Sequence, residues 1–181
     1  MKRTVVLIPG DGIGPEVTAA ARTCVDVLDA GIEWIEAYAG EPALKREGSL
    51  LPVRTLDLIK KHKLALKGPI TTPVGSGFRS INVALRQELD LYACVRPTWY
   101  MEGVVGARPG LNLMIIRENS EDLYAGIEFE DGEPETNALI EQINKISKKQ
   151  VREGSAISIK PISAFASERI ARYGLELDAF P

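Results

Sequence analysis

The sequence has few of the residues that most often carry out catalysis or bind metals. Its 181 residues include one histidine and two cysteines. Cys24 and Cys94 lie far apart in the chain, so we expect two buried free thiols and neither a disulfide nor a metal-binding pair. His62 lies between two lysines near the end of an expected helix, so we expect a solvated surface side chain without a catalytic role.

Long apolar segments and an excess of positive charge are also missing. No apolar run approaches the roughly 18 residues of a membrane-spanning helix, so we expect no membrane segment. The short apolar run near the N-terminus leads into Gly10–Asp11–Gly12 and not into a cleavage site, which predicts a cytoplasmic protein. With 22 basic and 25 acidic residues and no basic stripe, the sequence argues against a nucleic-acid partner.

Hydrophobic residues make up 45% of the chain, which is enough for the core of one or two domains. In the first half, their spacing predicts strands that alternate with helices. The predicted strands cover 4–8, 32–38 and 64–67, and the predicted helices begin at Pro15, Pro52 and Ile81. This alternation predicts an α/β layer with parallel strands.

After Arg96 and Pro97 the pattern changes to shorter strand-like segments joined by turns. The predicted strands cover 91–95, 111–116, 125–129 and 155–160, and the predicted helices lie near 135–149 and 165–173. We therefore predict two parts, residues 1–97 as the first part of a large α/β domain and residues 98–181 as a smaller α+β domain.

A glycine-rich turn, Gly10–Asp11–Gly12–Ile13–Gly14, follows the first predicted strand and precedes a helix. Such a turn can bring backbone amides close to a phosphate at a helix start. The match to a dinucleotide-binding fingerprint is incomplete, because no third glycine has the right spacing and Pro15 lacks an amide proton. The turn fits a structural strand-to-helix connection and a cofactor contact equally well.

Polar residues gather where the loop 68–80 leads into the next predicted helix. Ser80 fits the N-cap of this helix as well as it fits a ligand contact. Asn82 and Arg86 are four residues apart, so they share one helix face, which is either a solvated surface or part of a binding site.

Arg96 and Arg117 each lie at the end of an apolar strand-like run, where side chains project from the end of a sheet. Together with Arg86 they could hold a polycarboxylate, because each guanidinium can bind a carboxylate through two charge-assisted hydrogen bonds. On their own, however, the three arginines favour the simpler interpretation of three unrelated surface ion pairs. Tyr124 fits either a half-buried aromatic residue or a general acid with a cation beside it.

In combination, these segments resemble the β-decarboxylating dehydrogenases, the family of the isocitrate and isopropylmalate enzymes. The resemblance starts in 8–17, continues over 71–97 and 117–126, and covers residues 4–174 in all. The sequence Ser80–Ile81–Asn82 followed by Arg86 is similar to bacterial isocitrate dehydrogenases, whereas isopropylmalate enzymes have a leucine-rich helix there. The resemblance implies an isocitrate/isopropylmalate dehydrogenase-like fold, with an incomplete large domain and a smaller α+β domain.

The resemblance also implies roles for single residues in binding isocitrate. Ser80 and Asn82 would hydrogen-bond the substrate, with Ser80 near its γ-carboxylate. Three arginines would bind the remaining carboxylates, namely Arg86, Arg96 and Arg117.

A second set of implied roles concerns cofactor and catalysis. Thr72 would lie near the nicotinamide of NAD or NADP, between which the sequence gives no preference, and Ile13 would line the cofactor cleft. Tyr124 would give a proton to the enolate carbon after carbon dioxide has left. In this family, the second half of the sequence carries the aspartates that hold magnesium or manganese and the lysine that works with the tyrosine. No segment of the present sequence resembles these motifs.

The implied activity is oxidative decarboxylation of isocitrate to 2-oxoglutarate, a step of the tricarboxylic acid cycle, with a site that is incomplete in this chain. The alternative is a non-catalytic, truncated subunit that binds a tricarboxylate or a full-length partner. Homoisocitrate and 3-isopropylmalate are the alternative substrates. The segment 155–161 resembles the family's intersubunit clasp, so we expect a homodimer or another form of self-association.

Overall fold

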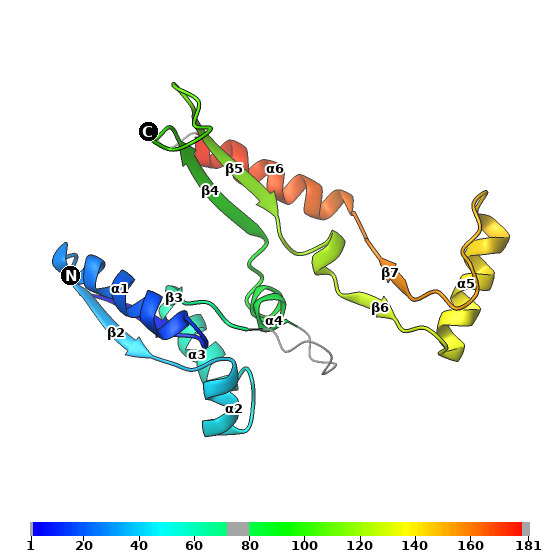
Figure 1. Cartoon of the computed structure of the whole chain (residues 1–181), viewed down its shortest axis with the longest axis horizontal. Helices are drawn as coiled ribbons and strands as arrows, with labels where there is room; N and C mark the ends of the chain where they lie inside the picture. Colours follow the sequence, from blue (N-terminus) through cyan, green and yellow to red (C-terminus); the bar gives the residue numbers. More distant parts are fainter. Residues whose placement is uncertain (1, 72–79, 179–181) are drawn as a thin grey trace. The chain divides into compact units, whose positions relative to one another are not determined.

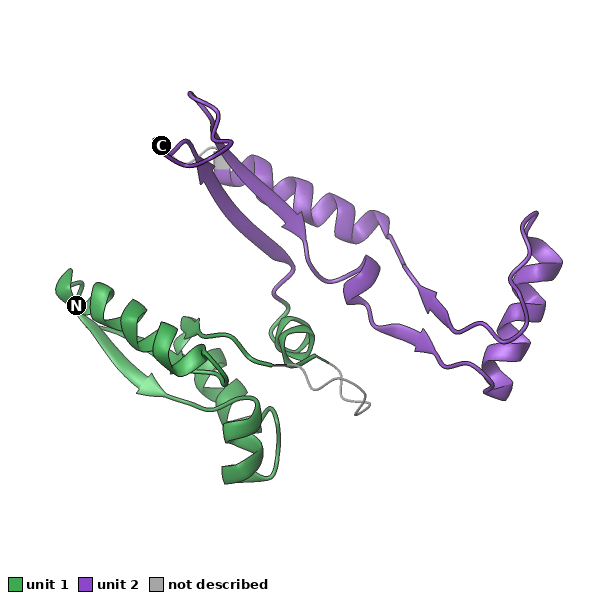
Figure 2. Ribbon diagram, in the orientation of Figure 1, with its two compact units in different colours: residues 1–90 green, residues 91–181 purple. Residues whose placement is uncertain are grey.

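The computed structural model of the chain describes residues 2–71 and 80–178. The chain folds as two compact units, Met1–Asp90 and Leu91–Pro181 (Figure 2). The boundary predicted after residue 97 lies inside strand β4 (Ala93–Trp99). No helix among the described residues is both long and apolar enough to cross a membrane.

The first unit is built on a parallel three-stranded sheet in the order β2–β1–β3 (Figure 1). Its elements are β1 (Arg3–Ile8), α1 (Gly14–Val27), β2 (Ile32–Glu36), α2 (Glu41–Glu47), α3 (Val53–His62), β3 (Ala65–Lys67) and α4 (Ile81–Glu88). Because β1 is the central strand, its residues from Val5 to Ile8 are buried and form a continuous apolar run. The predicted alternation of strands and helices and the parallel pairing are confirmed.

The core of this unit fixes the orientation of α4. Ile81 and Leu85, four residues apart, are buried in one cluster with Ile8 of β1. Asn82 and Arg86 each follow one of these anchors by one residue and are only partly buried. Packing of the apolar pair therefore turns the polar pair toward the edge of the core.

Helix α2 is absent from the sequence-based prediction. In the structure, Gly40, Pro42 and Gly48 delimit this short helix. Pro42 lies in the first turn, where its missing amide proton costs no hydrogen bond. Gly48 ends the helix in the left-handed conformation, with a φ of 71°.

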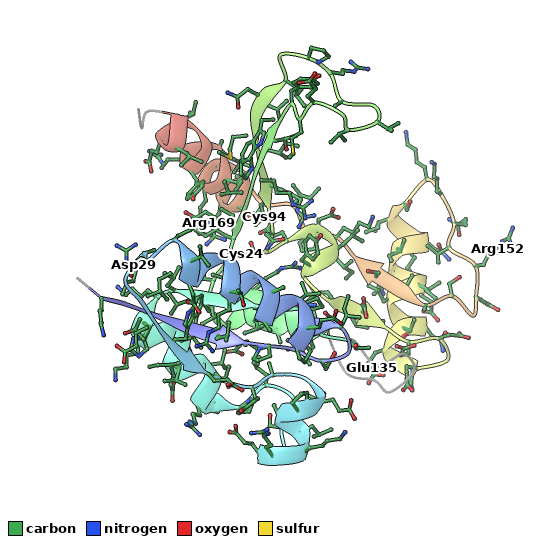
Figure 3. The ribbon with its side chains drawn as sticks, turned by 60° about the vertical axis from the view of Figure 1, so that its left-hand side comes forward. Cys24, Asp29, Cys94, Glu135, Arg152 and Arg169 are labelled. Carbon is green, nitrogen blue, oxygen red and sulfur yellow. The ribbon has the colours of Figure 1, made fainter. Side chains whose placement is uncertain are left out.

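Two of the rarer side chains differ from expectation. Cys24, expected to be buried, is exposed on α1, while Cys94 on β4 is partly buried, and both thiols are free (Figure 3). The buried face of α1 contains Gly14 and Thr18. Cys24 follows Thr18 by six residues, which places it on another side of the helix. His62 is partly buried instead of solvated, and its Nε2 atom has no hydrogen-bond partner among the described residues.

The second unit contains two antiparallel strand pairs, β4 with β5 and β6 with β7. Its further elements are β5 (Asn112–Glu118), the 3-10 helix η1 (Asp122–Tyr124), β6 (Ile127–Phe129), α5 (Pro134–Ile146), β7 (Ile157–Ile159) and α6 (Ala164–Asp178). Helix α6 packs along β5 (Figure 1). The β6–β7 pair and α5, which connects them, span residues 127–159 and include most of the segment 155–161 that resembles the family's clasp. From here on, the name clasp refers to residues 127–159.

The sequence predicts Arg96 at the end of a strand. In the structure it lies in the middle of β4. The strand continues through Pro97 to Trp99. Proline cannot donate a backbone hydrogen bond. Among the described strands β4 pairs with β5 alone, so β4 is an edge strand, where a proline is tolerated. Arg117 is the last residue but one of β5, close to its predicted position.

Candidate functional site

The glycine turn after β1 packs against the chain that leaves β3. Gly10 has a φ of 81°, and a Cβ atom there would overlap the carbonyl oxygen of Pro69. A Cβ atom on Gly14 would lie 2.7 Å from the same oxygen. Both positions need glycine for close backbone packing. The geometry therefore favours the structural interpretation at these two glycines and gives them no separate reason to bind a phosphate.

Asp11, within this turn, is a buried carboxylate that connects three loops. It accepts hydrogen bonds from the backbone amide of Thr71 at 2.6 Å and from that of Glu41 at 3.3 Å. Its own amide donates to the carbonyl of Pro69 at 3.1 Å. Burial by itself would raise the pKa of Asp11, but the hydrogen bonds from Thr71 and Glu41 and the charge of Lys67 together lower it. The carboxylate therefore stays ionised and holds the turn in place.

The residues with an expected cofactor role lie next to this junction. Ile13 occupies the N-cap position of α1 and is 67% exposed, so its side chain is accessible to a ligand. Thr72 lies outside the described residues. Thr71, just before it, is held by Asp11.

Helix α4 carries three of the expected substrate contacts. Ser80 occupies the N-cap position, but its side chain makes no capping hydrogen bond. The capping role proposed for its hydroxyl is therefore not observed, although the helix start is predicted correctly. Asn82 and Arg86 follow on α4, both partly buried.

Positive charge concentrates between β3 and α4. The pKa of Lys67 is lowered by desolvation and by the charge of Arg86, and Asp11 offsets this only in part. The Lys67 ammonium also donates to the carbonyl of Gly68 at 2.7 Å. Two neighbouring positive charges favour a nearby anion. Lys67 has no role in the sequence-based prediction, because it is a lone lysine at the end of a short strand.

In the second unit, the strand register brings Arg96 and Arg117 to one face of the β4–β5 pair. Arg96 pairs with Ile115, two residues before Arg117 on the same strand. Paired residues share a face, and alternate residues along a strand return to it. The two residues are thus diagonal neighbours on that face of the strand pair.

Arg117 and Tyr124 line a common cavity of about 490 Å³, closed on another side by residues of α6. The guanidinium carbon lies 5.1 Å from the centre of the Tyr124 ring. Its Nη2 atom donates to Oδ1 of Asn119 at 3.1 Å. Its Nε atom is buried and has no hydrogen-bond partner among the described residues. The guanidinium is therefore held at the edge of the cavity by one hydrogen bond, while its Nε atom is enclosed by protein atoms.

The turn between Arg117 and Tyr124 is held by two carboxylates. Glu118 accepts from the amides of Ser120 and Glu121, each at 2.9 Å, and from the hydroxyl of Ser120. Burial alone would raise the pKa of Glu118, but these hydrogen bonds lower it. Glu121 accepts at 2.7 Å from both the amide and the hydroxyl of Ser163, just before α6. The sequence alone does not indicate these roles, since charged residues in a turn are ordinarily solvated.

A metal site is not formed by the residues that the structure describes. Within residues 2–71 and 80–178, no group of three or more histidine, cysteine, aspartate or glutamate side chains could hold a metal ion. A divalent ion would need about six oxygen ligands. The described donors therefore do not fit magnesium or manganese.

Comparison with known proteins identifies the family. The sequence profile described as "Isocitrate/isopropylmalate dehydrogenase" matches residues 4–179. The chain belongs to this family. The isocitrate dehydrogenase [NADP] of Archaeoglobus fulgidus is 47% identical over 176 residues, which are 92% of this chain and 42% of that protein. The enzyme of the same name from Staphylococcus aureus is 43% identical and matches 95% of this chain and 44% of its own length.

Solved structures of the isocitrate/isopropylmalate dehydrogenase family confirm the predicted fold. Isocitrate dehydrogenase from Methylococcus capsulatus matches 97% of this chain with a TM-score of 0.78 and 39% identity. A β-decarboxylating dehydrogenase from Thermococcus kodakarensis matches with a TM-score of 0.64 and 31% identity. The chain spans less than half the length of these relatives, 47% and 45% respectively.

Proposed function

We propose that this chain supplies the tricarboxylate-binding part of an isocitrate dehydrogenase, which oxidatively decarboxylates isocitrate to 2-oxoglutarate. The observation that carries the proposal is Arg117, which lines a cavity of about 490 Å³ together with Tyr124 and whose guanidinium is held by Asn119. A carboxylate in this cavity could be held by the guanidinium through charge-assisted hydrogen bonds. The names of the relatives, isocitrate dehydrogenase [NADP], support the choice of substrate.

The number of cations matches the charge of the substrate. Isocitrate carries three carboxylates, and Arg86, Arg96 and Arg117 would each hold one through charge-assisted hydrogen bonds. Ser80 and Asn82 would add neutral hydrogen bonds, with Ser80 at the γ-carboxylate. Homoisocitrate and 3-isopropylmalate are alternative substrates, but an apolar substituent would fit poorly beside these two polar side chains.

Tyr124 would act as the proton donor of the reaction. When the bond to the departing carboxylate breaks, its electron pair stays on the neighbouring carbon, and that carbon then takes a proton. The nearby Arg117 guanidinium would stabilise the phenolate that remains. The tyrosine must therefore lie next to the carbon that loses carbon dioxide.

The cofactor that accepts the hydride would be NADP, as in the named relatives, with NAD as the alternative. Thr72 would lie near its nicotinamide, and Ile13 would line the cofactor cleft. Magnesium or manganese does not fit the described donors. We therefore propose that catalysis needs metal ligands other than the residues that the structure describes.

Two further expectations are part of this proposal. The clasp would join two copies of the chain, and the protein would work in the cytoplasm in the tricarboxylic acid cycle. The second candidate function, a non-catalytic subunit that binds a tricarboxylate or a full-length partner, is favoured by the lack of a metal-binding group among the described residues.

Calorimetric titration of the purified chain with isocitrate tests the binding proposal. We expect measurable binding, and a loss of about 10- to 100-fold in Arg96→Ala, because one charge-assisted contact disappears. Arg152→Ala, an exposed arginine on the clasp, is the matched control and should bind like the wild type (Figure 3). Absence of binding by the wild-type chain would contradict the proposed function.

Steady-state assays separate the two candidate functions. The chain alone, with isocitrate, manganese and either NADP or NAD, is expected to show no turnover. Turnover by this chain without any other polypeptide would refute the proposal that the site needs further residues. Isocitrate binding without turnover would support the tricarboxylate-binding role.

A further inference from the structure

Asn119 is the most buried polar residue near the expected substrate contacts of the second unit, with 5% of its surface exposed. Both ends of its side-chain amide are used. Oδ1 accepts from Nη2 of Arg117 at 3.1 Å, and Nδ2 donates to the carbonyl of Leu91 at 3.3 Å. The amide thus ties the end of β5 to the residues just before β4.

These contacts restrain the Arg117 guanidinium from two sides. Asn119 holds Nη2, and the Tyr124 ring lies 5.1 Å from the guanidinium carbon. The planar guanidinium has its donors in a fixed fork, so fixing one of them also sets the direction of the others. The buried Nε atom is the donor that this arrangement leaves without a partner among the described residues.

We propose that Asn119 is a positioning residue, which orients the Arg117 guanidinium for an anionic ligand without touching that ligand. The inference rests on the proposed function only in that the ligand is a carboxylate of isocitrate. The neutral amide is suited to this role because it accepts a hydrogen bond and leaves the positive charge of Arg117 uncancelled. A carboxylate in its place would orient the same group but compete with the ligand for its charge.

The contact itself is tested without any ligand, by a double-mutant cycle in urea unfolding of the full chain. The four proteins are the wild type, Asn119→Leu, Arg117→Met and the double variant. We expect the two residues to be coupled by about tenfold in the unfolding equilibrium constant, which corresponds to ~1.4 kcal/mol. Additive effects would overturn the inference.

The positioning role is tested by titrating the same four proteins with isocitrate. Asn119→Leu should weaken binding about tenfold in the wild-type background and leave it unchanged in the Arg117→Met background. An equal loss in both backgrounds would mean that Asn119 acts through general packing, and would overturn the role. Asn137→Leu, an exposed asparagine on α5, is the matched control and should bind like the wild type.

Asn119→Asp keeps the size of the side chain and tests the argument from charge. It should couple to Arg117 more strongly than asparagine does in the unfolding cycle, yet bind isocitrate at least about tenfold more weakly. Binding that rises together with the coupling would overturn the argument. If the wild-type chain binds no isocitrate, the proposed function fails, while the unfolding cycle still decides whether Asn119 holds Arg117.

Discussion

Single buried polar side chains hold the loops that carry the candidate site residues. Asp11 fixes Thr71, which directly precedes the segment 72–79, and Asn119 fixes Arg117. Leaving such a group without its partner costs about 1–3 kcal/mol, so each favours one loop conformation over many. Neither residue is expected to contact the substrate. Both are expected to influence substrate binding by holding the residues that do.

Asp11→Asn should destabilise the chain by about 1–3 kcal/mol at pH 7. An asparagine can accept one of the two backbone hydrogen bonds, but its amide nitrogen would face the second donor. Urea unfolding of both proteins measures the difference. Asp57→Asn, on the exposed side of α3, is the control and should stay within about 0.5 kcal/mol of the wild type.

The effect of Asp11→Asn should depend on pH with a defined sign. The folded-state pKa of Asp11 lies below its ordinary value, so its ionised form stabilises the fold. This stabilisation is complete above the unfolded-state pKa of about 3.9 and is lost as the pH falls through the lowered folded-state pKa. The difference between wild type and Asp11→Asn should therefore shrink between pH 5 and the acid range. A difference that grows on acidification would contradict the assigned cause.

The contact between Glu121 and Ser163 joins η1 to the start of α6. The Ser163 hydroxyl donates to Glu121 at 2.7 Å and accepts from the amide of Ala166 at 3.0 Å, as an N-cap serine does. Ser163→Ala should therefore destabilise the chain by about 1 kcal/mol in thermal or urea unfolding. In the Glu121→Ala background the loss should be smaller, because Glu121→Ala already removes the acceptor of the contact that the two side chains share. Ser158→Ala, an exposed position on β7, is the control, and equal losses in the two backgrounds would disprove the coupling.

Sequence patterns predict the elements of this chain better than the contacts between them. The apolar run of β1 and the helical spacing in α4 each follow from a local period, and both elements are found near their predicted bounds. The polar contacts join residues far apart in sequence. Asp11 and Thr71 are 60 residues apart, Glu121 and Ser163 are 42 apart, and Asn119 and Leu91 are 28 apart. Local sequence patterns do not indicate such distant partners. The family resemblance therefore predicts the candidate site residues, whereas the residues that hold them in place are seen only in the structure.

The paired strands of the clasp have an exposed apolar face, which we propose as the surface that a second copy of the chain would cover. The register pairs Ile127 with Ile159 and Phe129 with Ile157, while Glu128 pairs with Ser158. One face of this two-stranded pair is therefore apolar and the other polar. Ile127 and Ile159 remain 40% and 37% exposed. An isolated pair of strands is at best marginally stable in water, so covering this face would stabilise it.

We therefore predict that the chain forms dimers through the clasp. Light scattering after size-exclusion chromatography should give the mass of a dimer, and Ile159→Lys should shift it toward the monomer, because a charge would be buried on the apolar face. Val27→Lys, at an exposed position on α1, is the matched control and should leave the mass unchanged. A monomeric wild-type chain at micromolar concentration would refute the prediction. Equal dissociation by both variants would show that the association does not depend on the clasp, since Val27 lies in the other unit.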